Sequence, residues 1–251
     1  MENFSEFEQR GSAPQPNFSD ILSHTFNTYG KGIGWAILLI VITFVIPTLL
    51  SFVAGPLVGY NAVEASETMR NAGNPENPAE MMAQLMAIPG IQAYYGVSFL
   101  LSLLVYPLYA GFQYIFHKAN IGESVQFSDL FIGFRQNFVQ YLVFGLISMI
   151  VMSIAMLFCF FPVFLVAPLF FLGLPIIFFE NATAMDALKK SFTIAKDNYG
   201  TMLGVSFISM IIAVAGAILC GIGIVITFPV YFAAMYSAYC AFAGTPRQLT
   251  S

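Results

Sequence analysis

Side chains capable of acid–base or metal chemistry are few in this sequence and lie far apart. The two histidines are His24 and His117. Neither belongs to an HExxH pattern, which would place two zinc-binding histidines on one face of a helix. A GxGxxG phosphate-binding loop is also missing, and GKGIG at 30–34 is better interpreted as a flexible elbow, because glycine permits many backbone conformations. We therefore expect no catalytic residue, no cofactor and no metal site.

One group of positive charges has a spacing that suits anion binding. Lys189, Lys190 and Lys196 lie close together in the stretch TAMDALKKSFTIAKDNYG at 183–200. A lysine ammonium attracts a phosphate group as a compact point charge. The anion that these lysines meet depends on where the stretch lies, which the composition of the whole chain helps to decide.

The composition is that of a chain embedded in lipid. Hydrophobic residues make up 58% of the chain and charged residues only 9%, whereas soluble domains carry about 25% charged residues. Lys, Arg, Asp and Glu are absent from residues 32–63, 81–117, 136–179 and 198–246. A helix needs about 20 apolar residues to cross a hydrocarbon core of about 30 Å. Stretches such as AILLIVITFVIPTLLSFVA are apolar on all sides, which excludes alternating barrel strands and predicts helices.

The charge-free stretches predict six membrane spans. The stretch 136–179 would measure about 66 Å as one helix, since each residue adds about 1.5 Å. It must therefore turn back, and CFFP at 159–162 offers a proline for the turn. The last stretch divides in the same way at CGIG, residues 220–223, whereas the first two spans, about 34–54 and 91–114, are separated by a polar segment. We expect an all-α bundle, a polytopic membrane protein with six spans in three hairpins.

Lysine and arginine predict the orientation, because they are retained on the cytoplasmic side of short loops. With six spans, one side receives Arg10, Lys31, Lys118, Arg135, Lys189, Lys190, Lys196 and Arg247. The other side receives Arg70 alone. We therefore expect both termini in the cytoplasm and residues 55–90 in an extracytoplasmic loop. Each lysine of the group at 183–200 would then contribute about 1 kcal/mol to binding anionic lipid, unless these lysines only obey the topology rule.

The spans divide the chain into three regions. We expect residues 1–17 to form a disordered acidic tail, 18–244 a single six-span membrane domain, and 245–251 a cytoplasmic C-terminal tail. Inside the extracytoplasmic loop, NPENP predicts a break between two short pieces, of which the second is a surface helix. We expect Trp35 to anchor the first span at the headgroups, where tryptophan is enriched.

Three amphipathic segments precede the expected hairpins. Residues 18–29, 127–141 and 183–200 each place apolar side chains at helical spacing, with polar side chains opposite. In the third segment the apolar stripe consists of Met185, Leu188, Phe192, Ala195 and Tyr199. Thr183 and Asp186 have the spacing of a capping box. We expect each segment to be a cytoplasmic surface helix in the membrane interface or over the bundle. The likeness of the three segments has two alternative explanations, internal triplication of the sequence or a structural constraint that all three share.

Two segments of the sequence resemble parts of a known group of proteins. PLYAGFQYIFHKANIGESVQFSDLFIGF at 107–134 and ENATAMDALKKSFTIAKDNYGTMLG at 180–204 look like elements of a broad group of uncharacterised six-span bacterial membrane proteins. That group is related in appearance to the membrane domain of some glycerophosphodiester phosphodiesterases. The resemblance implies a six-span fold in the bacterial inner membrane. It implies no activity, because the group has no agreed one and the catalytic barrel of the phosphodiesterases is absent here.

The pattern favours a non-enzymatic role. The expected spans hold no charged residue, although coupled transporters usually keep one there despite a cost of at least about 2.5–3.5 kcal/mol. We expect an accessory or scaffold subunit that binds membrane lipid or a partner membrane protein, and no nucleic acid. The alternative is an uncoupled transporter of a lipid-like or small neutral solute, with a groove where prolines kink the spans. These prolines are Pro47, Pro107, Pro168, Pro175 and Pro229.

Overall fold

The structure is a computed structural model that describes residues 11–158, 161–218 and 223–246. Every regular element in these residues is helical, and none of them is a strand. Six stretches are long and apolar enough to cross a membrane: Phe18–Leu57, Ile91–Ile121, Phe138–Leu157, Pro162–Glu180, Tyr199–Ile218 and Gly223–Ala243. The predicted all-α class and the predicted number of spans are therefore confirmed for the described chain.

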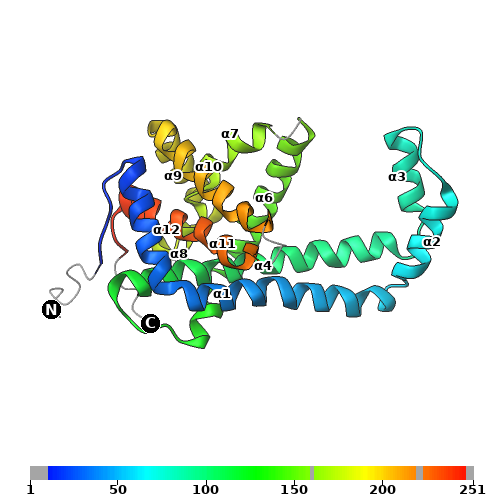
Figure 1. The fold of residues 1–251 in the computed structure, drawn as a ribbon, viewed down its shortest axis with the longest axis horizontal. Coiled ribbons are helices and arrows are strands. Elements are labelled where there is room, and N and C mark those ends of the chain that lie inside the picture. Colours follow the sequence, from blue (N-terminus) through cyan, green and yellow to red (C-terminus); the bar gives the residue numbers. More distant parts are fainter. Residues whose placement is uncertain (1–10, 159–160, 219–222, 247–251) are drawn as a thin grey trace. The chain divides into compact units, whose positions relative to one another are not determined.

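Contacts divide the chain into two compact units. The first unit comprises Met1–Val41 and Tyr106–Ser251, and the second comprises Ile42–Val105. Helix α1 (Phe18–Leu57) and helix α4 (Ile91–Ile121) each contribute residues to both units (Figure 1). The single membrane domain expected over 18–244 stays a prediction.

The second unit contains two short helices between its two long ones. Helix α2 covers Ala62–Ala72 and helix α3 covers Pro78–Met86. Each begins at an asparagine whose side chain accepts a backbone N–H of the first turn, Asn61 for α2 and Asn77 for α3, and this satisfies donors that the helix itself cannot. The predicted break at NPENP is confirmed, since it separates α2 from α3.

A small apolar cluster holds the second unit together. Ala65, Ile88 and Ile91 are buried, and partly buried aromatic side chains pack against them. Among these, Tyr60 and Tyr94 stack with ring centroids 4.3 Å apart. The chain passes so close to itself here that a Cβ on Gly90 would overlap the backbone of Gly59, and both glycines have positive φ angles of 71° and 78°, which favour glycine.

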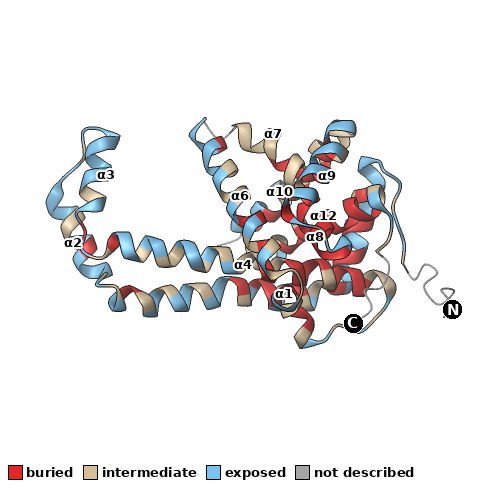
Figure 2. Cartoon of the chain, turned by 180° about the vertical axis from the view of Figure 1, so that it is seen from behind, coloured by how far each residue is buried: buried red, intermediate tan, exposed pale blue. Residues whose placement is uncertain are grey.

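The first unit is built from the remaining helices. They are η2 (Phe127–Phe131), α5 (Ile132–Arg135), α6 (Phe138–Leu157), α7 (Phe161–Phe170), α8 (Gly173–Glu180), α9 (Ala184–Asp197), α10 (Tyr199–Ala215), η3 (Gly216–Ile218), α11 (Gly223–Thr227) and α12 (Pro229–Ala243). Helix α6 packs on α7, α8 on α9, and α10 on α12. Helices α8 and α12 are buried along most of their lengths (Figure 2), so they form the core of this unit.

Aromatic stacking and close backbone approach join α4 to its neighbours. Phe112 of α4 and Phe232 of α12 stack with ring centroids 4.4 Å apart and an interplanar angle of 5°. A Cβ on Gly133 would overlap the carbonyl oxygen of Pro107, and one on Gly111 would crowd the carbonyl of Leu130. The segment that contains η2 and α5 therefore packs against α4 at backbone contact distance.

The elbow expected at 30–34 is wrong. Helix α1 runs through these glycines without interruption. Gly32 is buried, and a Cβ placed on it would lie 3.2 Å from the side chain of Ile115. Glycine usually weakens a helix interior by about 0.5–1 kcal/mol, but here the small residue permits close packing on α4 and the helix continues.

The single amphipathic helix expected over 127–141 is also wrong. The segment forms the short helices η2 and α5, and α6 begins at Phe138. Between them Asn137 adopts a left-handed conformation with φ 56°, which ends one helix and redirects the chain. The amides of Gln136 and Asn137 bind carbonyls of α8 instead of facing solvent.

The third amphipathic segment folds as a helix, α9. Thr183 caps α9 by accepting the N–H of Asp186 at 3.2 Å, as the capping-box spacing predicts. The residues of α9 that are buried are Ala184, Ala187, Ser191 and Ala195. Of the expected apolar stripe, Ala195 is buried, whereas Met185 and Phe192 are exposed by 52% and 50%. The predicted turns at CFFP and CGIG fall largely on residues 159–160 and 219–222, which lie outside the described residues.

Candidate functional sites

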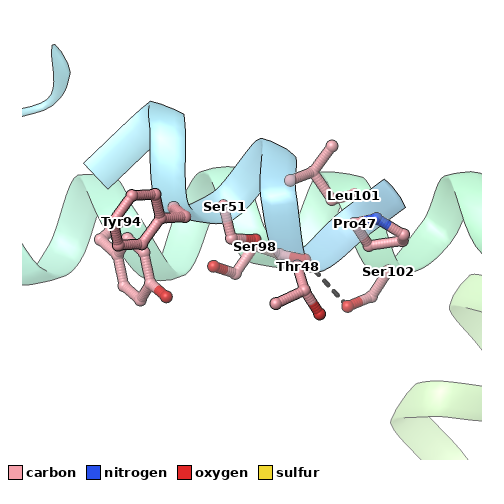
Figure 3. A pocket seen from close by; sticks show the side chains of 8 residues that line it. Pro47, Thr48, Ser51, Tyr94, Ser98, Leu101 and Ser102 are labelled. Carbon is pink, nitrogen blue, oxygen red and sulfur yellow. Dashed lines mark hydrogen bonds between the residues drawn. The ribbon is translucent and has the colours of Figure 1, made fainter. Parts of the chain in front are cut away.

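A groove lined by hydroxyl groups lies between α1 and α4 in the second unit (Figure 3). Its volume is about 350 Å³. It is lined by Pro47, Thr48, Ser51, Phe52, Tyr94, Ser98, Leu101 and Ser102. Proline has no amide hydrogen, so α1 lacks one helical hydrogen bond where the groove forms.

The hydroxyl groups of this groove are positioned by their own helices. Thr48 Oγ1 donates to the carbonyl of Phe44 at 2.7 Å, and Ser102 Oγ donates to the carbonyl of Ser98 at 2.8 Å. Because each hydrogen is engaged, the oxygen lone pairs remain available as acceptors. The described lining includes no carboxylate, histidine or basic side chain. The groove is therefore suited to hydrogen bonding with a neutral group.

Apolar side chains surround this groove on the outer surface of α1 and α4. The most exposed are Leu49, Phe52, Val53, Leu57 and Leu100, each with more than half of its surface accessible. An exposed apolar surface of this kind marks contact with lipid or with another protein. The two long helices of the second unit thus present hydroxyl groups within an otherwise apolar face.

A second groove adjoins the first in the same unit. Its volume is about 580 Å³, and it shares Ser51, Phe52 and Tyr94 with the hydroxyl-lined groove. It extends to Asn61 and Glu64 at the start of α2. The two grooves together follow the side of the second unit from Pro47 to the first turn of α2.

The structure separates the three lysines of α9 that the sequence grouped together. Lys190 Nζ lies 2.7 Å from Glu180 Oε2, and Tyr239 also donates to Glu180 Oε1 at 3.1 Å. Lys189 and Lys196 are exposed and make no ion pair with any residue that the structure describes. Of the three lysines of α9, only Lys189 and Lys196 therefore have an ammonium group free to bind an anion.

The two histidines belong to a buried polar network in the first unit. His24 Nδ1 lies 2.8 Å from Ser237 Oγ, and His24 Nε2 lies 2.9 Å from the carbonyl of Ser12. His117 Nδ1 lies 3.3 Å from the hydroxyl of Tyr236. Buried polar groups with hydrogen-bond partners hold a fold together, so this network links α1, α4 and α12. Among the described residues no group of three His, Cys, Asp or Glu side chains could hold a metal ion.

A buried ion pair is the polar contact that sequence reasoning missed. Lys118 Nζ lies 2.7 Å from Asp129 Oδ2, with 11% of each side chain accessible. The same ammonium lies 4.9 Å from the ring centroid of Tyr114, a distance at which a cation is attracted to an aromatic face. The sequence signal was ambiguous, because an aspartate in a first helical turn also suits the helix dipole.

Trp35 lies on α1 four residues after Lys31 and is partly buried. Its expected role as an interfacial anchor stays a prediction. Trp35 lies on the same continuous helix as the first candidate span, so the position of that span in a membrane determines the depth of the Trp35 side chain.

The fold and these surfaces define a multi-pass α-helical membrane protein, because six helices are long and apolar enough to cross a membrane. Comparison of the chain with protein-family models, curated proteins and solved structures finds no match. The resemblance to six-span bacterial membrane proteins therefore stays a prediction.

Proposed function

We propose that this protein is a non-enzymatic membrane protein, an accessory or scaffold subunit that binds lipid or a partner membrane protein. In this proposal its six spans form three hairpins, and α9 lies on the cytoplasmic face before the third hairpin. Both termini lie in the cytoplasm, and the membrane is the bacterial inner membrane. The strong asymmetry of lysine and arginine between the two sides supports this orientation.

The observation that carries the proposal is the hydroxyl-lined groove on α1 and α4. Thr48 and Ser102 are exposed on helices whose neighbouring side chains are apolar. In hydrocarbon, serine and threonine hydroxyls stabilise contacts between helices by about 0.6 to 2 kcal/mol each. A transmembrane helix of a partner that carries hydrogen-bond donors would satisfy these oxygens and cover the exposed apolar side chains.

The same groove argues against an enzyme. General acid–base catalysis needs a side chain that titrates near the working pH and lies within hydrogen-bond reach of the reacting group. The described groove lining offers hydroxyls and apolar groups. Recognition by shape and hydrogen bonds fits this set of side chains better than catalysis.

Co-purification tests the proposal. The tagged protein is extracted from native membranes in a mild detergent, and the stoichiometry of any partner is measured by quantitative mass spectrometry. We expect Thr48→Val with Ser102→Ala to reduce the recovered partner several-fold, since these changes remove the acceptors and keep the shape. Ser66→Ala with Thr68→Val is the matched control, because both hydroxyls donate to carbonyls of their own helix, α2, outside the groove. Recovery of no partner with wild-type protein would refute the scaffold role.

One observation favours a second function, uncoupled transport of a lipid-like or small neutral solute. The two adjoining grooves share three residues and run from Pro47 to α2, and kinked spans form such paths in transporters. The purified protein alone in liposomes would then move solute. Solute flux without any partner supports the transporter. No solute flux, together with a fixed stoichiometry of a co-purified partner, supports the scaffold.

A further inference from the structure

Helix α9 is fixed to the first unit through one face. Ser191 Oγ donates to the carbonyl of Leu169 at 2.6 Å and accepts from the N–H of Leu172 at 3.2 Å. Ala184, Ala187 and Ala195 are buried on the same face. These contacts determine which side chains of α9 point away from the protein.

A row of alternating apolar and basic side chains lies on the outer surface of α9. It consists of Met185, Lys189, Phe192 and Lys196, which we call the α9 row. Successive members are three or four residues apart, the spacing that places side chains on one face of a helix. Met185 and Phe192 are exposed by 52% and 50%, and Lys189 and Lys196 are exposed as well.

The α9 row ends next to a candidate span. Helix α9 ends at Asp197, and α10, which belongs to a candidate span, begins at Tyr199. Where α10 begins to cross the membrane, the last turn of α9, which carries Lys196, lies at the boundary. Apolar side chains of such a helix enter the acyl boundary, and its lysines reach the phosphate groups.

The acidic residues of α9 form no ion pair with the lysines of the row in the described part of the chain. Asp186 Oδ2 accepts from the hydroxyl of the cap residue Thr183 at 2.7 Å. At 100° per residue, Asp197 points about a quarter turn away from the lysines of the row, and Asp186 points about 60° away from Lys189. Lys190 is on that acidic side, where it pairs with Glu180.

We propose that the α9 row binds the phosphate headgroups of anionic lipids in the membrane that holds the spans. Lys189 and Lys196 contact the phosphates, while Met185 and Phe192 insert between the acyl chains. Lys190 takes no part, because its ammonium is engaged by the protein. This inference rests on the membrane insertion that the proposed function assumes, and it names the lipid class for that function.

Lipid retention tests the proposal. Wild-type protein is reconstituted in nanodiscs of phosphatidylcholine mixed with phosphatidylglycerol, extracted in a mild detergent, and its retained lipids are measured by native mass spectrometry. We expect wild-type protein to retain phosphatidylglycerol preferentially. Since each lysine near the surface contributes about fivefold, Lys189→Gln with Lys196→Gln should reduce this preference by about 10- to 30-fold.

Two control variants make the test specific. Lys190→Gln removes the same charge from the same helix and should leave the preference unchanged, and Lys189→Arg with Lys196→Arg should retain it. An unchanged preference in the double glutamine variant would overturn the proposal, and so would an equal loss in Lys190→Gln. Excess inorganic phosphate should not displace the lipid, because binding also requires the apolar contacts; displacement would overturn the lipid assignment.

The experiment separates this proposal from the proposed function. Partner recovery is measured on the same preparations. A double glutamine variant that loses its lipid preference and keeps its partner supports the α9 row without changing the scaffold role. A wild-type protein with a lipid preference and no partner would refute the scaffold role and leave the α9 row intact.

Discussion

The side-chain amide of Asn137 donates a hydrogen bond to the carbonyl of Ile177 at 2.9 Å. Beside it, Gln136 Nε2 donates to the carbonyl of Phe178 at 3.1 Å. Both carbonyls belong to the last turn of α8, where no following turn supplies backbone N–H groups. Two side-chain amides from the start of α6 therefore cap the end of a buried helix.

The next polar residue of the same segment caps the following helix. Gln140 Oε1 accepts the backbone N–H of Ala184, the first residue of α9, at 2.9 Å. The residues from 136 to 140 thus bind both sides of the α8–α9 connection, which explains why the chain interrupts its helix there.

Replacing Asn137 should destabilise the first unit. Asn137→Ala leaves the carbonyl of Ile177 without its donor, a loss of about 1–3 kcal/mol, and it also puts alanine in a left-handed conformation that costs about 1–2 kcal/mol more. Asn137→Gly should lose only the first contribution, because glycine adopts that conformation freely. Thermal unfolding in detergent measures both, with the exposed Asn74→Ala as the matched control. Equal melting temperatures for Asn137→Ala and the control would contradict this account.

The sequence predicted the span count because that count depends on long local runs of apolar residues. The backbone conformations of residues 127–141 and 30–34 could not be predicted in the same way. Gln136 and Asn137 find partners about 40 residues away in α8, and a periodic pattern reports only which residues are polar. A polar side chain on a helix face and one that caps a distant helix look alike in sequence. Gly32 likewise continues its helix because of Ile115, which lies far along the chain.

The buried face of α9 shows the same limit. The segment was correctly predicted as a capped helix, because Thr183 and Asp186 interact locally. Its buried face follows the small residues rather than the large apolar ones, since close packing on α8 and α7 requires alanine and serine. Hydrophobicity alone does not distinguish a face that packs on protein from a face that contacts lipid.

A methyl group on Gly133 should disrupt the contact between α5 and α4. Its Cβ would overlap the carbonyl oxygen of Pro107, so the backbone would have to shift. Overpacking of this kind typically costs about 1–3 kcal/mol. Gly96→Ala is the matched control, because nothing lies within 4 Å of the added methyl group, and in a helix it should raise stability by about 0.5–1 kcal/mol. The yield of monodisperse protein and the melting temperature should therefore fall in Gly133→Ala and rise in Gly96→Ala. A stabilised Gly133→Ala protein would contradict the packing described.

The two ion pairs should respond differently to the loss of one partner. Asp129→Asn leaves Lys118 nearly buried without its paired carboxylate, and breaking such a pair costs about 3–5 kcal/mol. Glu180→Gln opens the pair with Lys190, whose side chain is 44% accessible, and exposed pairs contribute only about 0–1 kcal/mol. Asp129→Asn combined with Lys118→Met should recover part of the lost stability, because it removes the unpaired charge. Measured free energies of unfolding in detergent should show a larger loss of stability for Asp129→Asn than for Glu180→Gln. Similar losses in the two variants would show that the Lys118 pair is solvated.

Labelling of introduced cysteines should place Arg70 and Lys196 on opposite sides of the membrane. Basic side chains are retained in the cytoplasm, and Arg70, on α2, is the one cation expected outside. In a chain whose native cysteines are replaced, Arg70→Cys should react with a membrane-impermeant maleimide applied to intact cells. Lys196→Cys should react only after the membrane is opened, and Lys31→Cys should behave in the same way as a second inner position. Six spans place residues 31 and 196 on one side because an even number of crossings separates them, so labelling of either from outside would overturn the orientation.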